Sequence, residues 1–148
     1  MIHVQASPPE HHDWIASRAG LSLHAGFMAL EAMDDAGRIV GMVGFDGWTP
    51  SSVALHVALD TPSALRHLIY PVFGLVFDPE PEGCGKRRIN LTVLSTNTRS
   101  LALVKHLGFK ETHRVKDGWD LGVDIVVFEM RREHCRWIRH ETEEVWAA

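Results

Sequence analysis

The stretch SVALHVALD, residues 52–60, alternates strictly between bulky and small side chains. Its bulky positions are Val53, Leu55, Val57 and Leu59. The positions between them carry small residues and a single imidazole, that of His56. Because successive side chains of a β-strand point to opposite faces, the alternation predicts a strand with one packed face and one open face.

Six further apolar runs also predict strands. They cover residues 2–6, 27–33, 38–46, 88–94, 109–117 and 123–130. The segment DDAG, residues 34–37, separates two of these runs, and turns of this composition favour a hairpin. Asp117-Gly118 and Gly122 supply similar turn residues between the last two runs, so a second hairpin is expected there.

Helical spacing of apolar residues predicts two helices in the first half of the chain. The first runs from about residue 11 to residue 19 and stops at Gly20. The second starts with Thr61 as its N-cap and Pro62 as its first helical residue. Pro71 lies inside the second pattern and removes one backbone hydrogen bond, so we expect a kink or a split helix there.

A third helix is predicted within STNTRSLALVKHLGF, residues 95–109. Thr96 or Asn97 can cap its start, and Gly108 is the residue type that usually ends a helix in the left-handed conformation. The predicted order is therefore β-α-β-β-β-α-β-α-β-β. Since a strand–helix–strand crossover is right-handed and parallel, residues 53–94 should form one such unit, and the other strands should pair antiparallel. We expect a mixed α/β fold with helices on both faces of the sheet, in one domain spanning residues 1–148.

Composition and charge narrow the classes of function. The formal net charge is −4, whereas proteins that bind duplexes usually carry a basic excess, so the charge argues against nucleic acid as a partner. No apolar run approaches the ~20 residues that cross a membrane. Cys84 and Cys135 are the only cysteines and lie far apart, which favours a reduced, cytoplasmic protein without a disulfide scaffold. No recognised zinc-ligand spacing appears, so no metal is expected.

The element order, with the third helix inside it, resembles the GNAT N-acetyltransferase family over about residues 1–130. Asn97, Ser100, Leu103 and the pair Gly108-Phe109 occupy positions of the family pattern N-x-x-A/S-x-x-L-Y-x-x-x-G-F. The resemblance implies a mostly antiparallel sheet of six to seven strands, in which a parallel pair, residues 52–60 and 88–94, splays apart. It also implies direct transfer of an acetyl group from acetyl-CoA, held in that gap, to an amine.

The family's cofactor pose implies particular contacts in this chain. The pantetheine arm would pair with strand backbone, the phosphates would lie at the start of the second helix, and the third helix would contribute side chains. The residues carried over in this way are Val57, Ala58, Leu59, Ser63, Ala64, Arg66, Asn97 and Ser100. General physics points to the same place, because ligands bind beyond the carboxyl ends of parallel strands and helix N-termini attract phosphate.

Two departures from the family pattern concern binding and catalysis. The family's glycine-rich turn is replaced by DTPSALRH, residues 60–67, which has no glycine and begins with the acidic Asp60. Val104 stands where the family has a tyrosine, which commonly protonates the departing thiolate. Valine has no proton to give, so another acid or water would serve, or turnover has been lost.

Acetyl transfer needs a base that takes a proton from the amine. His56 is the first candidate, because an imidazole accepts protons at neutral pH and its alanine neighbours leave space around it. Glu31 and Asp46 are competitors. Each has a structural alternative: His56 can be a half-buried packing residue, and Asp46 can simply open the turn that follows it.

Several readings of the function stay open. The acceptor can be a small-molecule amine, a peptide N-terminus or a lysine. The chain can instead be a binding module that has kept the fold without turnover, or a nucleic-acid modifier of phage type. Trp14, Trp48 and Trp119 lie in or beside loops that set acceptor choice in the family, and residues 126–138 are a candidate homodimer surface.

Overall fold

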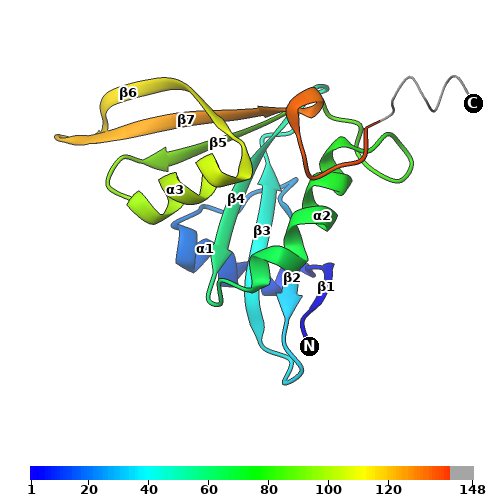
Figure 1. Ribbon diagram of the computed structural model, residues 1–148. Coiled ribbons are helices and arrows are strands. Elements are labelled where there is room, and N and C mark those ends of the chain that lie inside the picture. Colours follow the sequence, from blue (N-terminus) through cyan, green and yellow to red (C-terminus); the bar gives the residue numbers. More distant parts are fainter. Residues whose placement is uncertain (141–148) are drawn as a thin grey trace, which may run out of the picture.

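The computed structural model describes residues 1–140 and shows one seven-stranded sheet flanked by helices (Figure 1). The strands are β1 His3–Ala6, β2 Met28–Met33, β3 Ile39–Asp46, β4 Ser52–Leu59, β5 Arg88–Leu94, β6 Lys110–Asp120 and β7 Val123–Arg131. The α-helices are α1 Asp13–Ala19, α2 Ala64–Phe77 and α3 Thr98–Leu107, with short 3-10 turns η1 Pro9–His11 and η2 Arg132–His134. This order confirms the one predicted from the hydrophobic pattern.

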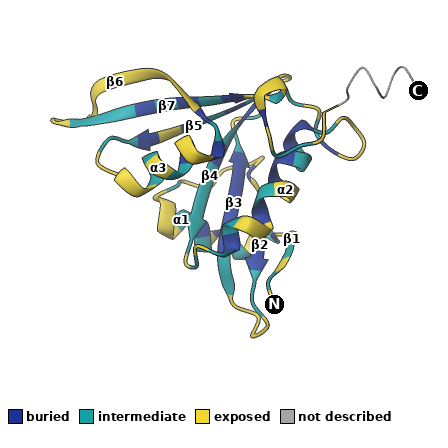
Figure 2. Ribbon diagram, in the orientation of Figure 1, coloured by how far each residue is buried: buried dark blue, intermediate teal, exposed yellow. Residues whose placement is uncertain are grey.

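The sheet has the strand order β1-β2-β3-β4-β5-β7-β6. All neighbouring pairs are antiparallel except β4 and β5, which are parallel and joined through α2. The mixed, mostly antiparallel sheet with one parallel pair is therefore confirmed. Inserting β7 between β5 and β6 leaves β6 at the sheet edge, where all of its residues are exposed (Figure 2).

Helices cover both faces of the sheet, as predicted. Ile15 of α1 packs in a cluster with Phe27, Ala29 and Met42 on one face. On the other face, α2 and α3 pack against the bulky positions of β4, including Val53 and Leu55. The 14-residue helix α2 and the 10-residue helix α3 thus each bury one apolar face in the larger of the two hydrophobic clusters.

The start and the interior of α2 differ from the prediction. Residues 61–63 form a turn, and the helix begins at Ala64 with Ser63 rather than Thr61 as its N-cap. The carbonyls of Thr61 and Pro62 accept the N–H groups of Ala64 and Leu65, which tightens this turn. The expected split at Pro71 does not occur, because α2 continues through this residue to Phe77.

The other helix ends follow the predicted chemistry. Gly20 and Gly108 end α1 and α3 in the left-handed conformation, with φ values of 68° and 106°. Asn97 caps α3 by accepting the N–H of Ser100 at 3.2 Å. After η2, Trp137 donates from Nε1 to the carbonyl of Leu107 at 2.8 Å, so the segment following the sheet is fastened to the end of α3. No helix within residues 1–140 has the length and apolarity needed to cross a membrane.

Candidate functional site

The parallel strands β4 and β5 separate after three residue pairs. Ser52 pairs with Arg88, Val53 with Ile89, and Ala54 with Asn90, and the register ends there. Within residues 1–140, the rest of β4 pairs with β3 alone. In an antiparallel ladder every second residue directs its N–H and C=O away from its partner strand, so the last five residues of β4 present backbone groups toward the side that β5 has left.

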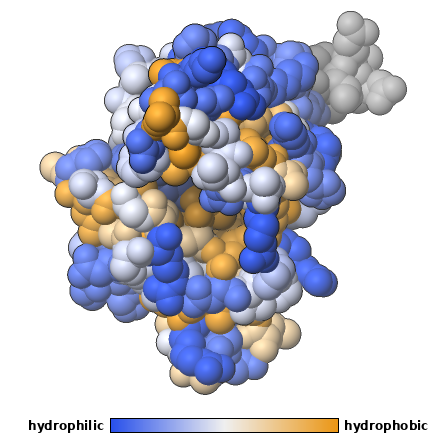
Figure 3. Space-filling model, turned by 90° about the vertical axis from the view of Figure 1, so that its left-hand side faces the viewer, coloured by the Kyte–Doolittle hydropathy of each residue, from blue (hydrophilic) through white to orange (hydrophobic). Residues whose placement is uncertain are grey.

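This open side of β4 is where the backbone contacts of the cofactor were predicted. Val57, Ala58 and Leu59 are all half-buried, whereas Val53 near the start of the strand is fully buried. Figure 3 looks onto the side of the molecule where α3 and the outer end of β7 lie. A hydrophobic area lies hollowed at its centre, between hydrophilic surfaces above and below.

His56 lies just beyond the point where the two strands separate, on the face that carries α1. Its Nε2 lies 2.8 Å from Oδ1 of Asp46, the last residue of β3. The strands bring them together because His56 pairs with Gly44 and Asp46 pairs with Ala54. The two predicted residues are therefore diagonal neighbours on one face of the sheet.

The second carboxylate oxygen of Asp46 faces another histidine. His24, on the loop between α1 and β2, places Nε2 3.3 Å from Oδ2 of Asp46. The side chain of His24 is 55% exposed, that of His56 is 26% exposed, and that of Asp46 is 15% exposed. Sequence reasoning missed His24, because a loop histidine carries no periodic signal and meets Asp46 only through the folded chain.

The hydrogen bond to Asp46 fixes the chemistry available to His56. An ionised carboxylate only accepts, so Nε2 of a neutral His56 carries the proton and Nδ1 keeps its lone pair. Such an imidazole can accept a proton at Nδ1 while Asp46 stabilises the resulting cation. This arrangement has the form of a general base oriented by a third group.

Glu31, the third predicted base candidate, lies in separate surroundings on β2. Its side chain is fully buried, and it accepts from Gln5 at 2.7 Å and from His11 Nδ1 at 2.8 Å. Burial alone would raise the pKa of Glu31, but hydrogen bonds from Ser7, His11 and Gln5 outweigh it and hold this pKa below its usual value. A carboxylate held ionised by three donors is a poor base, and its geometry suits fastening η1 to the sheet.

The turn before α2 is where phosphate contacts were predicted. Ala64 is fully buried and its N–H donates to Thr61, so this group is already engaged. Ser63 is half-buried and Arg66 is exposed at the same end of the helix. Arg18 of α1 forms a bidentate ion pair with Asp60, at 2.9 and 3.0 Å. These hydrogen bonds hold the pKa of Asp60 below its usual value and offset its charge beside the helix start.

The residues predicted on α3 have structural surroundings of their own. Asn97 and Ser100 are joined by the capping hydrogen bond, and Asn97 is exposed. Val104, at the position of the family's tyrosine, is buried in the core at 5% exposure. A side chain there packs against the sheet, so position 104 supplies no acid in this chain.

The three tryptophans proposed to line an acceptor pocket have different neighbours. Trp14 packs with the α1 cluster under the guanidinium of Arg18. Trp48 donates from Nε1 to the carbonyl of Gly26 at 2.9 Å, and Trp119 is 68% exposed near the end of β6. Among residues 1–140 no group of three or more His, Cys, Asp or Glu side chains has a geometry that could hold a metal ion.

Comparisons with known proteins establish the fold. No protein-family model matches the chain, and no curated protein matches its sequence. Solved structures do match. The spermidine/spermine N-acetyltransferase SpeG from Vibrio cholerae, in complex with manganese ions, superposes with a TM-score of 0.70 at 13% identity, covering 89% of this chain and 93% of SpeG.

Two further structures of the same enzyme match equally well. A dodecameric form in an intermediate state has a TM-score of 0.69 at 12% identity, covering 89% of this chain and 94% of that one. A chimera of the Vibrio cholerae enzyme and hSSAT has a TM-score of 0.70 at 11% identity, covering 94% of this chain and 99% of that one. At such identities the likeness shows a shared fold, and it confirms the fold expected from the resemblance to GNAT proteins.

Proposed function

We propose that this chain is an acyl-CoA-dependent N-acyltransferase, most simply an N-acetyltransferase, whose single domain moves an acetyl group from acetyl-CoA directly to an amine. One observation carries the proposal: β4 and β5 part after Ala54 and Asn90, and His56, hydrogen-bonded to Asp46, stands just beyond that point. A base oriented by a carboxylate thus lies on a strand whose pairing with β5 ends at Ala54. The solved structures of the same fold belong to enzymes that acetylate amines.

The donor substrate would bind along the open side of β4. The backbone of Val57, Ala58 and Leu59 is available to pair with an amide-containing arm, as a strand would. Arg66 and the N–H of Ser63 would contact the phosphates at the start of α2, where the helix dipole favours anions. The N–H groups of Ala64 and Leu65 would contribute less, because they already donate within the turn.

His56 would act as the general base. Its Nδ1 takes a proton from the acceptor amine as the nitrogen forms a bond to the thioester carbonyl carbon. The carbon–sulfur bond then breaks, and the CoA thiolate takes a proton from water, since Val104 has none to give. A thioester is already activated, so placing the two reactants in register supplies much of the remaining acceleration.

The acceptor would be an amine, and the solved structures of the same fold suggest which amines to test first. The neighbours act on spermidine and spermine, so polyamines are the first acceptors to test. The net charge of −4 suits a cationic acceptor at long range. No metal is part of the proposal, and we propose a cytoplasmic protein because its two cysteines are unpaired. Self-association through β7 and the segment after it also belongs to the proposal.

Calorimetric titration with acetyl-CoA, with CoA and ATP as controls, tests the donor first. Saturable binding in the micromolar range supports the proposal, and absence of binding at millimolar acetyl-CoA overturns it. A thiol-release assay with spermidine, spermine, amino acids and lysine-containing peptides then tests turnover. Omission of the amine should leave only slow thioester hydrolysis.

A second reading, a binding module without turnover, is favoured by one observation, the buried Val104 in the tyrosine position. It predicts micromolar CoA binding with no thiol release above the rate without enzyme for any amine. The titration and the thiol-release assay together therefore distinguish an active transferase from a binding module without turnover.

A further inference from the structure

A cavity lies at the amino end of the parallel strands, beside the turn between β3 and β4, whereas the proposed phosphate contacts lie beyond the carboxyl end of β4. Its volume is about 620 Å³, within the range of small-molecule sites. It is bounded by the loop before β2, the turn between β3 and β4, and the connection from α2 to β5; the lining residues that matter are Met28, Trp48, Glu80, Pro81, Cys84 and Lys86. These segments precede β4 and β5, so the length of β4, roughly 20 Å, separates the cavity from the carboxyl end of that strand.

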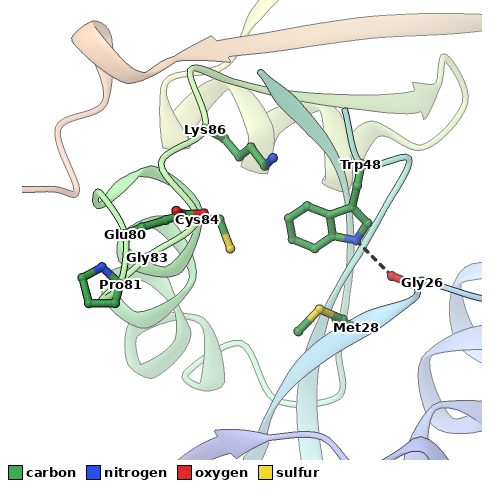
Figure 4. Close-up of a pocket in the computed structure, with 8 residues that line it drawn as sticks. All are labelled: Gly26, Met28, Trp48, Glu80, Pro81, Gly83, Cys84 and Lys86. Carbon is green, nitrogen blue, oxygen red and sulfur yellow. Dashed lines mark hydrogen bonds between the residues drawn. The ribbon is translucent and has the colours of Figure 1, made fainter. Parts of the chain in front are cut away.

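One wall of the cavity is fixed by Trp48. The hydrogen bond from its Nε1 to Gly26 holds the indole in place, and its ring packs against Phe45 at a centroid distance of 6.2 Å. The indole, Met28, Cys84 and Lys86 all point into the same space (Figure 4). Met28 is 52% exposed, so its thioether and the indole face present apolar surface to whatever enters.

The facing wall is the loop from α2 to β5, and it is fastened to the end of α2. Backbone N–H groups of Cys84 and Lys86 donate to Leu75 and Val76, at 2.7 and 2.9 Å. A Cβ at Gly83 would lie 2.3 Å from the carbonyl oxygen of Asp78, so only glycine allows this close approach. Both walls are therefore set without a ligand, which is the usual condition of a small-molecule site.

Two opposite charges line this cavity without neutralising each other. The ammonium of Lys86 donates to the carbonyl of Thr49 at 2.8 Å and lies 5.8 Å from the Trp48 ring centroid, which leaves two of its three donors for other partners. Glu80 belongs to the facing loop. Within residues 1–140 no ion pair shorter than 4.0 Å joins Lys86 to Glu80 or to any other carboxylate.

We propose that this cavity binds a small zwitterion with an apolar, planar body, of the class of free aromatic α-amino acids. The carboxylate of the ligand would pair with Lys86, its ammonium with Glu80, and its ring would pack on Trp48 and Met28. An anion alone would leave Glu80 facing a like charge, and an amine alone would do the same at Lys86. The inference does not depend on the proposed acetyl transfer, because it uses none of the residues of that site.

Calorimetric titration of the full chain with L-phenylalanine tests the proposal, with three truncated probes alongside. These are 3-phenylpropionate, which lacks the ammonium, phenethylamine, which lacks the carboxylate, and L-alanine, which lacks the ring. We expect saturable binding of L-phenylalanine below about 1 mM and each truncated probe at least roughly fivefold weaker, since one charge-assisted contact is worth on the order of 1 kcal/mol. Absence of binding at 10 mM L-phenylalanine, or equal binding of a truncated probe, overturns the assignment.

Variants locate the binding in the cavity. Lys86→Met removes the charge and keeps most of the side-chain length, and Glu80→Gln removes the charge and keeps the shape. Each should weaken binding of L-phenylalanine at least about fivefold. Lys105→Met and Glu111→Gln, at exposed positions of α3 and β6, are the matched controls and should change nothing. Circular dichroism confirms that each variant is folded. If both cavity variants bind L-phenylalanine as tightly as the wild type, the ligand binds at another site and the proposal is wrong.

Discussion

Asp46 is shared by two imidazoles, and this sharing decides what each can do. One carboxylate oxygen faces His56 at 2.8 Å, and the other faces His24 at 3.3 Å. The more buried His56 makes the shorter contact, so its ring orientation is the better defined of the two. His24, on the exposed side, adds a second donor that holds the carboxylate in place. Substitutions of Asp46, His56 and His24 should therefore have different effects on activity.

His56→Gln should lower kcat/KM for the amine by about 10²-fold or more, because it removes the base without removing the donor site. The affinity for acetyl-CoA should change less than about threefold. The kinetic measurement is thiol release at saturating acetyl-CoA, and calorimetry supplies the affinity. An unchanged kcat/KM would exclude His56 as the base.

Asp46→Asn should also lower kcat, because an amide can stabilise either tautomer of His56 and does not stabilise its cation. Its effect should be much smaller in the His56→Gln background, since residues that act as a unit are not additive. Additive losses in the double variant would mean that Asp46 acts independently of His56.

His56 and Asp46 could each be predicted as candidate bases from the sequence, but the hydrogen bond between them could not. The sequence marked both residues as candidates, through alternation in one case and a strand end in the other. It could not show that they meet, because that depends on the β3–β4 register, in which Gly44 pairs with His56. Glu31 looked equivalent to them in the sequence and differs only through its three donors, which come from segments outside β2.

Glu31→Gln should show how much this buried carboxylate stabilises the fold. The folded pKa of Glu31 lies below its value in the unfolded chain, about 4.3, so its contribution is fully present above that value and is lost as pH falls toward the folded pKa. At pH 7 the substitution should cost about 1–3 kcal/mol, because an amide fits the three donors less well.

Urea unfolding at pH 7 and at successively lower pH measures this effect. The wild type should lose more of its free energy of unfolding than Glu31→Gln does as pH falls below about 5. Parallel pH profiles for the two proteins would contradict the assignment of this sensitivity to Glu31.

At the scale of elements, the contact between α1 and the end of β4 governs the approach to α2. Sequence reasoning placed the start of α2 at Thr61 and left Asp60 as an unfavourable charge beside a phosphate site. The structure starts α2 at Ala64 and pairs Asp60 with Arg18, which lies 42 positions earlier in the chain. The local sequence pattern predicts the helix α2, but whether the charge of Asp60 at its start is compensated depends on Arg18, which belongs to α1.

Arg18→Gln should weaken acetyl-CoA binding about threefold at low salt, because it leaves the charge of Asp60 uncompensated near the phosphates. The double variant Arg18→Gln with Asp60→Asn should restore the affinity. Stability should change by less than about 1 kcal/mol, since the pair is exposed. Calorimetry at two salt concentrations measures the effect, and failure of the double variant to recover would place the phosphates elsewhere.

Gly44→Ala tests how closely α1 and its loop pack on β3. An added Cβ would lie 2.4 Å from Cζ of Phe27, so the ring would have to move. We expect a loss of about 1–3 kcal/mol in the free energy of unfolding. Ala102→Ser, on the exposed face of α3, is the control and should stay within about 0.5 kcal/mol. A Gly44→Ala protein as stable as the wild type would mean that this packing is looser than described.

For the whole molecule, the strand topology was easier to predict than the cavity beside Trp48 or the contacts of Asp46 with His56 and His24. Hydrophobic periods located the strands within residues 1–140, and the right-handed crossover rule predicted that β4 and β5 are parallel. The insertion of β7 between β5 and β6 was not predicted, because periodicity locates strands and does not give the order in which they pair. The cavity beside Trp48 had no sequence signal, because its walls come from three connections that are distant in the chain.

Acetyl-CoA should raise the melting temperature of the intact protein if it binds the folded state alone. At a concentration of about 100 Kd the stabilisation is ~2.7 kcal/mol, which corresponds to several degrees for a chain of this size. Differential scanning fluorimetry measures the shift, and Lys86→Met should show the same shift as the wild type. A melting temperature independent of acetyl-CoA at that concentration would contradict the proposed function.

The exposed edge strand β6 has a consequence for how the molecule opens. Among the strands of residues 1–140 it pairs with β7 alone, and none of its residues is buried. Its amide protons should therefore exchange with solvent deuterium sooner than those of β3 and β4, whose strands are paired on both sides for at least part of their length. A protease should likewise cut first at the hairpin tip, around Gly122. The cut chain would still contain β4, His56 and Asp46 in covalent continuity, so cleavage at this point would leave the region of the proposed chemistry intact.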